Sequence, residues 1–377
     1  MIPRRLPAVF MRGGTSKALL FHARDLPQDR SEWDSLFLSA LGSPDTYGRQ
    51  LNGMGGGLSS LSKVCIINPS KSKDADIDYT FAQVAVREAH VDYSSNCGNM
   101  SAAVGPFAID ENLVSASDGQ TTVRIFNTNT LKIIHSTFHV EAGRAVLDGE
   151  LEIPGVAGSG APIRLDFLEP GGASTGKLLP TGKPIDILDV PGVGKVEVSM
   201  VDAAKACAFV TAKTLGITGN EMPDELDRNP SLFEKLAAIR LHASVAMGIS
   251  RSLEEARKRT GIPLIGFVSP PQEARTLSGE KLSVTEADMT VRMIANEQPH
   301  RALPITASMC VAIAARIKDT TVFRSIRNCD WEELRLAMPS GVLTVKAEVK
   351  EDNNSWHAVY GSCFRTARRL FDGFVYT

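Results

Sequence analysis

The segment that decides the fold reads Asn96-Cys97-Gly98-Asn99-Met100-Ser101-Ala102-Ala103-Val104-Gly105-Pro106-Phe107-Ala108-Ile109. From Met100 onward it predicts a helix built mostly of small, apolar residues. Apolar side chains occupy nearly the whole circumference of this helix, which is typical of a helix enclosed by other elements rather than one lying on a surface. We therefore expect a buried central helix over residues 100–109.

Two stretches of the second half repeat stretches of the first half. Met309-Cys310-Val311-Ala312-Ile313-Ala314, followed by Asp319, resembles Met100–Gly105 followed by Asp110, and Lys205–Val210 resembles Lys17–His22. The repeats occur in the same order and predict an internal duplication. Chance similarity between short runs of small apolar residues is the alternative.

The chain length of 377 residues suits two domains. Short β-branched or aromatic runs predict strands over residues 8–11, 18–22, 64–68, 80–86, 122–127 and 133–140. Helices are expected over residues 31–41 and, as a hairpin, over 231–247 and 252–259. A segment rich in Gly, Pro and Ser, residues 155–194, joins the halves. We predict an N-terminal lobe over residues 1–184, with a returning C-terminal strand over 361–377 as a candidate addition, and a C-terminal lobe over 185–360.

Composition excludes several classes of partner. Lys and Arg number 41 against 43 Asp and Glu, so the net charge of −2 lacks the basic excess of a nucleic-acid or anionic-membrane binder. Apolar runs are far shorter than the roughly 20 residues that span a bilayer, and no signal-peptide pattern is found, so a cytoplasmic location is expected. The six cysteines form no CxxC pair, which fits neither a disulfide framework nor a zinc site. A small-molecule ligand is the expected partner, and a homodimer is left open.

Cys97 stands directly before the expected helix. A helix N-terminus carries partial positive charge and unpaired N–H donors, which favour a thiolate and bind carboxylates. The candidate binding residues of this first turn are Gly98, Asn99, Met100 and Ser101. A nucleophile, an acid or base, and an anion site are all open roles for Cys97. The alternative is a small buried hydrophobic residue, but its Asn and Gly neighbours favour function over a core position.

Further stretches carry a family resemblance. They are Met11-Arg12-Gly13-Gly14-Thr15-Ser16-Lys17, Gly42-Ser43-Pro44-Asp45, Gly53-Met54-Gly55-Gly56, Ser62-Lys63-Val64, Asn96–Asn99, Val104-Gly105-Pro106-Phe107, Leu179-Pro180-Thr181-Gly182, Pro339-Ser340-Gly341 and Arg365-Thr366-Ala367-Arg368. Together they resemble the PrpF family of methylaconitate and aconitate isomerases, methylitaconate delta-isomerase and oxalomesaconate tautomerase. The resemblance implies an α+β, diaminopimelate-epimerase-like fold. In this fold two pseudo-symmetric lobes each wrap a mostly antiparallel sheet around a central helix, and the site lies in the cleft between them.

The second lobe departs from the pattern of the related racemases. Diaminopimelate epimerases and proline racemases use one cysteine from each lobe as acid and base. Overlaying residues 300–310 on the second-cysteine motif places Met309 at that position, whereas matching the two central helices end to end places Thr306 there. Since one residue turns a helical side chain by about 100°, Cys310 is not expected to be the second base. The PrpF resemblance instead implicates Lys63.

Lys63 lies between a loop rich in Gly and Ser, residues 53–62, and an apolar strand. A lysine that enters a strand is usually a solvated edge charge. Glycines before it allow backbone to approach a ligand closely, which favours a functional role. The loop lacks the P-loop and Rossmann patterns, so nucleotide binding is not expected.

The other candidate substrate-binding residues are polar positions near these motifs. Arg12, Thr15 and Ser16 form a turn after a strand that suits a carboxylate, although a well-capped turn explains them equally well. Ser62 adjoins Lys63. His300, with Arg301, precedes the second central helix and is expected to bring positive charge. Ser340 and Gly341 offer a hydroxyl and a bare amide. The histidines lack a complete metal-ligand set, so neither a metal nor a cofactor is expected.

From these residues and the family resemblance we expect a cofactor-independent isomerase of small unsaturated di- or tricarboxylic acids such as aconitate. Cys97 and Lys63 would move protons, so that a double bond shifts or changes between cis and trans. The alternatives are an amino-acid epimerase or racemase, and an accessory protein that supports a partner dehydratase.

Overall fold

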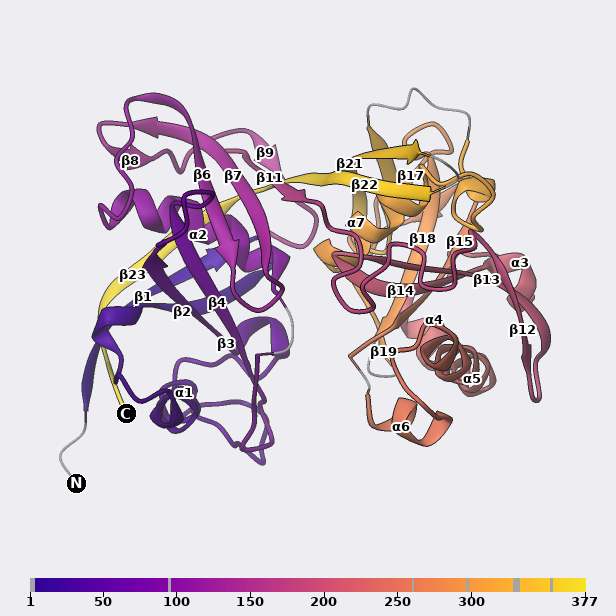
Figure 1. Ribbon diagram of the computed structural model, residues 1–377, viewed down its shortest axis with the longest axis horizontal. Coiled ribbons are helices and arrows are strands. Elements are labelled where there is room, and N and C mark those ends of the chain that lie inside the picture. Colours follow the sequence, from indigo (N-terminus) through magenta and orange to yellow (C-terminus); the bar gives the residue numbers. More distant parts are fainter. Residues whose placement is uncertain (1–3, 94–95, 260, 296–297, 328–332, 353–354) are drawn as a thin grey trace. The chain divides into compact units, whose positions relative to one another are not determined.

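The computed structural model describes residues 4–93, 96–259, 261–295, 298–327, 333–352 and 355–377 (Figure 1). The chain divides into two compact units: unit 1 comprises Met1–Asp166 with Phe364–Thr377, and unit 2 comprises Phe167–Cys363. The chain thus leaves unit 1 ahead of residue 184, where the sequence analysis divided the lobes. The boundary falls within strand β11 (Ile163–Leu168), which pairs with a strand of unit 1, β7 (Lys132–Glu141).

In its described residues, unit 1 is a mostly antiparallel sheet with two α-helices. Its other strands are β1 (Arg5–Gly13), β2 (Ser16–His22), β3 (Lys63–Pro69), β4 (Ile77–Val84), β5 (Val91–Asp92), β6 (Gly119–Asn127), β8 (Arg144–Ala145), β9 (Leu151–Glu152), β10 (Ser159–Gly160) and β23 (Ala367–Tyr376); its α-helices are α1 (Trp33–Leu41) and α2 (Gly98–Asp110). The C-terminal strand β23 pairs antiparallel with β1, and Figure 1 shows it in yellow beside indigo β1. Gly42 ends α1 in the left-handed conformation, with φ +75°, as a C-terminal glycine commonly does.

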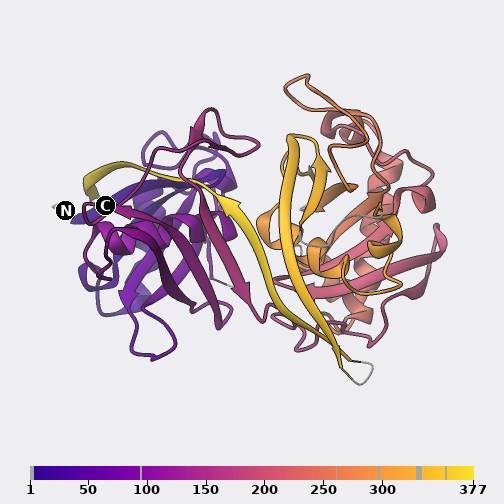
Figure 2. The same cartoon turned by 90° about the horizontal axis from the view of Figure 1, so that it is seen from above.

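Unit 2 has the same kind of sheet and more helix. Its strands are β12 (Asp186–Val190), β13 (Gly194–Ala203), β14 (Lys205–Thr211), β15 (Leu264–Ser269), β16 (Ala274–Arg275), β17 (Lys281–Leu282), β18 (Met289–Ala295), β19 (Gln298–Pro299), β20 (Leu334–Met338), β21 (Gly341–Asp352) and β22 (Ser355–Arg365); its helices are α3 (Ala212–Leu215), α4 (Pro223–Asp227), α5 (Pro230–Ala246), α6 (Leu253–Lys258) and α7 (Ile305–Ala314). Figure 2 shows β21 and β22 as a long antiparallel hairpin. The expected helical hairpin is confirmed as α5 and α6.

The two units repeat one strand order. In unit 1, β1–β2 is antiparallel, β2–β3 parallel, β3–β4 antiparallel, β4–β6 parallel and β6–β7 antiparallel. In unit 2, β13–β14, β14–β15, β15–β18, β18–β20 and β20–β21 follow the same alternation. In each unit the central helix, α2 or α7, lies in the chain between the strands of the second parallel pair. Five successive pairings in the same order support duplication over chance similarity.

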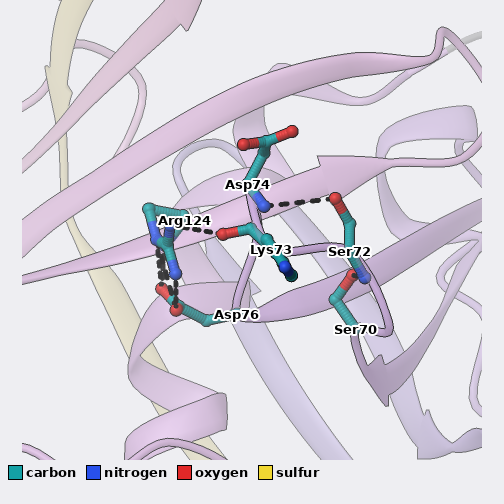
Figure 3. A network of polar contacts seen from close by, with 6 residues as sticks. All are labelled: Ser70, Ser72, Lys73, Asp74, Asp76 and Arg124. Atoms are coloured by element: carbon teal, nitrogen blue, oxygen red, sulfur yellow. Dashed lines mark hydrogen bonds and ion pairs between the residues drawn. The ribbon is translucent and has the colours of Figure 1, made fainter.

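A repeated side-chain contact strengthens this conclusion. In unit 1, Asp76 Oδ1 lies 2.7 Å from Arg124 Nη2, while Asp76 Oδ2 accepts from Arg124 N and the guanidinium donates to Lys73 O (Figure 3). In unit 2, Asp288 and Arg335 make the same ion pair at 2.8 Å and the same backbone contact. Arg335 also donates to the carbonyl three residues before Asp288, as Arg124 does relative to Asp76. Each ion pair joins the residue just before the first strand of the second parallel pair (β4 or β18) to the other strand of that pair (β6 or β20).

The expected buried central helix is confirmed. Within α2, the side chains of residues 100–109 are buried, and in α7 every residue is buried. α2 packs against β1, β6 and β7, and α7 packs against β13, β14 and β21. An added Cβ at Gly105 would lie 2.5 Å from Ser136 Oγ, so this glycine lets α2 approach β7 closely. Within the described residues, no helix is long and apolar enough to cross a bilayer.

Candidate active site

Side-chain alternation along β3 places Lys63 on the face opposite the core cluster that packs against α1. Val64 and Ile66 face a core cluster that includes residues of α1. Because successive strand side chains point to opposite faces, Lys63 and Cys65 share the other face. Burial raises the pKa of the Cys65 thiol, and the neighbouring Cys97 raises it further, whereas Lys63 acts in the opposite direction. Cys97 and Lys63 are therefore both close enough to Cys65 to act on its charge, which brings the two expected catalytic residues to one region of unit 1.

Lys63 is held within this region by β4. Its side chain is only 7% exposed, and its Nζ donates a hydrogen bond to Gln83 Oε1. The Nζ also lies 5.1 Å from the centre of the Phe81 ring. Lys63 pairs directly with Gln83, and Cys65 with Phe81, across the β3–β4 ladder. The strand register thus sets the surroundings of the lysine.

Cys97 is the N-cap residue of α2 and is partly exposed. Its carbonyl accepts hydrogen bonds from the Ser101 backbone N–H at 3.1 Å and from Ser101 Oγ at 3.2 Å. The Ser101 hydroxyl is therefore fully buried and donates its hydrogen bond to the backbone of the same helix rather than to a ligand. The side chain of Met100 is also fully buried. The N–H groups of the first turn, from Gly98 to Met100, have no acceptor within the helix and are the donors that this terminus can offer to a carboxylate.

The β1–β2 turn lies against this helix terminus. Asn99 Nδ2 donates to Thr15 Oγ1 at 3.1 Å, and Asn99 Oδ1 accepts from Arg365 Nε at 3.3 Å. A Cβ added at Gly14, whose φ is +50°, would lie 2.2 Å from Asn99 Oδ1. Only glycine therefore fits beside Asn99 without displacement. This contact links the Thr15 turn to α2 and to Arg365.

Two expected binding residues hold the surrounding backbone. Arg12 Nη1 donates to Gly14 O at 3.0 Å and to Thr366 O at 2.9 Å. Burial, together with the charge of Arg368, lowers the pKa of Arg12. Ser62 is fully buried, and its Oγ accepts from Gln50 Nε2 at 2.7 Å. Ser62 thus supports the loop that leads to Lys63. Ser16, at 3% exposed, is also buried.

In unit 2, burial, with the charge of Lys205, lowers the pKa of His300 to about 4. Because the ring is desolvated, this burial opposes the positive charge expected of His300. Among the described residues, His300 Nε2 and Ser340 Oγ are buried without a hydrogen-bond partner. Gly341 begins β21 with φ +135°. Arg301 pairs with Asp224 at 3.1 Å.

The second central helix carries Pro304 at its N-cap, the position that Cys97 holds on α2. Neither sequence overlay, on Met309 or on Thr306, anticipated this residue. Cys310 is fully buried in the middle of α7, and its Sγ lies 3.4 Å from Val201 O. Burial, together with Cys207, raises the pKa of Cys310 well above its usual range. No group of three or more His, Cys, Asp or Glu side chains arranged for a metal occurs in the described part of the chain.

Gln83 and Arg365 are the residues that sequence reasoning missed. Gln83 lies within an expected strand, but its contact with Lys63 depends on which strand pairs with which. Arg365 belongs to a motif of the family resemblance, yet only the fold brings it beside Asn99. Had the register of the β3–β4 hairpin been known, it would have placed Gln83 directly opposite Lys63.

A central helix enclosed by a mostly antiparallel sheet in each unit defines the epimerase-like fold. A probable proline racemase from Agrobacterium radiobacter shares it, with a TM-score of 0.53 and 12% identity over 98% of this chain and 92% of that one. The family model described as PrpF protein matches residues 3–377, and the chain belongs to the PrpF family.

Relatives that match nearly the whole of this chain are named as isomerases. The 3-methylitaconate isomerase of Eubacterium barkeri is 41% identical, over 99% of this chain and 97% of that protein. The 2-methyl-aconitate isomerase of Shewanella oneidensis is 35% identical, over 98% and 96%. A crystal structure of methylitaconate-delta-isomerase has a TM-score of 0.89 and 40% identity, over 100% and 96%. The chain is therefore an isomerase.

Proposed function

We propose that this isomerase acts on small unsaturated di- or tricarboxylic acids of the aconitate and itaconate kind, and that it works by proton transfer without a cofactor. The observation that carries the proposal is that Lys63 shares a face of β3 with Cys65 and that both Lys63 and Cys97 act on the charge of Cys65. A thiol and an amine are both able to exchange protons near neutral pH when their surroundings favour it. The names of the relatives support the substrate class.

The proposed reaction removes one proton from the substrate and returns one proton to it. One of the two groups removes a proton from the allylic carbon of the substrate, and the negative charge spreads over the double bond and the conjugated carboxylate. The other group returns a proton at the far end of the former double bond, so the double bond moves by one position. Rotation about the bond that has become single, followed by the reverse transfer, gives cis/trans isomerization.

Residues of unit 1 can stabilise this charge before it develops. The N–H groups at the start of α2 point toward the end of the helix where Cys97 lies, and such preorganised donors stabilise a developing anion. Thr15 and Asn99 add a hydroxyl and an amide next to the same terminus.

A racemase of the two-thiol kind is not favoured, because the N-cap of α7 is Pro304, which carries no acid or base.

The proposed function is tested by the ultraviolet absorbance of the purified protein mixed with cis-aconitate, trans-aconitate, methylaconitate, itaconate-type or oxalomesaconate-type acids, beside an assay for amino-acid racemization. We expect turnover of at least one acid, surviving exhaustive chelation, and no racemization. Racemization without acid isomerization, or activity that chelation abolishes, would refute the proposal.

A further inference from the structure

The Lys63 amine has an unusual partner for a buried lysine. Gln83 Oε1 accepts its hydrogen bond, and within the described residues Lys63 forms no ion pair. Buried ammonium groups are commonly neutralised by a carboxylate, because an uncompensated charge is costly to desolvate. Here the acceptor is a neutral amide.

The orientation of that amide is set by the backbone. Gln83 Nε2 donates to Ser62 O at 2.9 Å and to Ser59 O at 3.0 Å. These two carbonyls can only accept, so the NH₂ end of the amide must face them. The Oε1 atom is left facing Lys63. Both strands of the hairpin and the loop before β3 therefore cooperate to present one acceptor to the lysine.

A neutral acceptor has a different chemical consequence from a carboxylate. A carboxylate within about 4–6 Å favours the ammonium form and raises the cost of releasing its proton. An amide oxygen fixes the nitrogen by a hydrogen bond but adds no charge. A neutral hydrogen-bond acceptor therefore suits an amine that must both lose and regain a proton in each turnover.

We propose that Gln83 is the positioning residue of Lys63: it holds the amine on the face of β3 that Cys65 shares, and its neutrality lets the amine pass between its two protonation states. This proposal rests on the proposed proton transfer by Lys63. The competing account is purely structural, in which Gln83 only ties the 59–62 loop to β4.

The test uses the full-length protein with three variants. Gln83→Glu keeps an oxygen beside Lys63 but adds a charge, and Gln83→Leu removes the acceptor. Gln50→Leu is the matched control, because Gln50 bonds to Ser62 Oγ in the same loop without touching Lys63. Circular dichroism and the thermal midpoint establish that each variant is folded.

The first measurement needs no substrate. Competitive acetylation of Lys63 by trace acetic anhydride, followed across pH by mass spectrometry, reports how much free amine is present. In Gln83→Glu we expect the labelling curve of Lys63 to move to higher pH by about one unit or more. In Gln50→Leu we expect no displacement. An unmoved curve in Gln83→Glu, or an equal displacement in Gln50→Leu, would overturn the proposal in favour of the structural account.

The second measurement is the pH profile of turnover. Gln83→Glu should lose about tenfold in kcat near pH 7 with KM changed less than about threefold, and should recover as the pH rises. Gln83→Leu should lose kcat without such recovery, which keeps the test valid if the glutamate variant folds poorly. A displaced labelling curve with unchanged kcat would show that Gln83 governs Lys63 but that Lys63 does not move protons. That result would overturn the proposed function separately from the Gln83–Lys63 contact.

Discussion

Cys97 is the residue on which the proposed chemistry most directly depends. Cys97→Ser should lower kcat by about a thousandfold, because an alcohol is a far weaker acid than a thiol and cannot take its place as general acid or base near neutral pH. KM should change little, since the backbone donors of α2 remain. Steady-state kinetics with the best substrate of the acid panel provides the measurement.

Cys310→Ala is the control for this substitution. The Cys310 thiol is fully buried in α7, so its removal should cost stability and leave most of the turnover. A loss of activity in Cys310→Ala as deep as in Cys97→Ser would contradict the assignment of the chemistry to unit 1.

His300 makes the stability of the protein depend on pH. Its folded pKa is about 4, because burial and Lys205 disfavour the charged ring, whereas an unfolded histidine has a pKa of about 6.5. Between these values the unfolded chain binds a proton that the folded chain does not. The free energy of unfolding therefore falls as the pH drops from about 6.5 to 4, by up to ~3 kcal/mol.

Urea denaturation at pH 7 and pH 5 checks this dependence. In His300→Gln, whose side chain does not titrate, the loss of stability between the two pH values should be smaller than in the wild type. Equal losses in the two proteins would mean that other groups cause the dependence.

At the scale of elements, the junction of the β1–β2 turn with α2 can be tested by a pair of glycines. Gly14 and Gly143 both have positive φ, at +50° and +73°, but only Gly14 has a neighbour that an added Cβ would strike. Alanine at either position should cost about 1 kcal/mol of backbone strain. Gly14→Ala should in addition displace Asn99 and lower kcat/KM, whereas Gly143→Ala should keep wild-type kinetics. Equal kinetics in the two variants would show that the contact with Asn99 has no part in the reaction.

Several elements could be predicted from local pattern alone. The α2 helix is apolar nearly all round, and the runs that became β3 and β7 are short and β-branched, so composition was sufficient. The orientation of Gln83 toward Lys63 could not be predicted, because register depends on a partner strand distant in sequence. The roles of Arg12 and Ser62 were also beyond the sequence, since their hydrogen-bond partners, Thr366 and Gln50, are set by the fold.

At the scale of the whole molecule, the duplicated units have diverged in chemistry while keeping their framework. The Asp76–Arg124 and Asp288–Arg335 contacts keep the same donors and acceptors in both units. The N-caps of the two central helices differ, with Cys97 on α2 and Pro304 on α7. Unit 1 supplies a thiol and an amine, so the proposed reaction needs no second thiol from unit 2.

The source of the proton returned to the substrate distinguishes the two mechanisms open to Cys97. In proton transfer, the Cys97 thiol and the Lys63 ammonium exchange with solvent, so a reaction run in deuterated water should place deuterium on carbon in the product. In covalent addition, Cys97 attacks the double bond, rotation follows and the thiolate leaves, so carbon-bound hydrogens stay unlabelled. We expect at least partial labelling at the allylic position, measured by NMR at low conversion. A control with Cys97→Ser corrects for exchange that occurs without the enzyme's chemistry. Unlabelled product from active enzyme would reject the allylic mechanism and favour addition by Cys97.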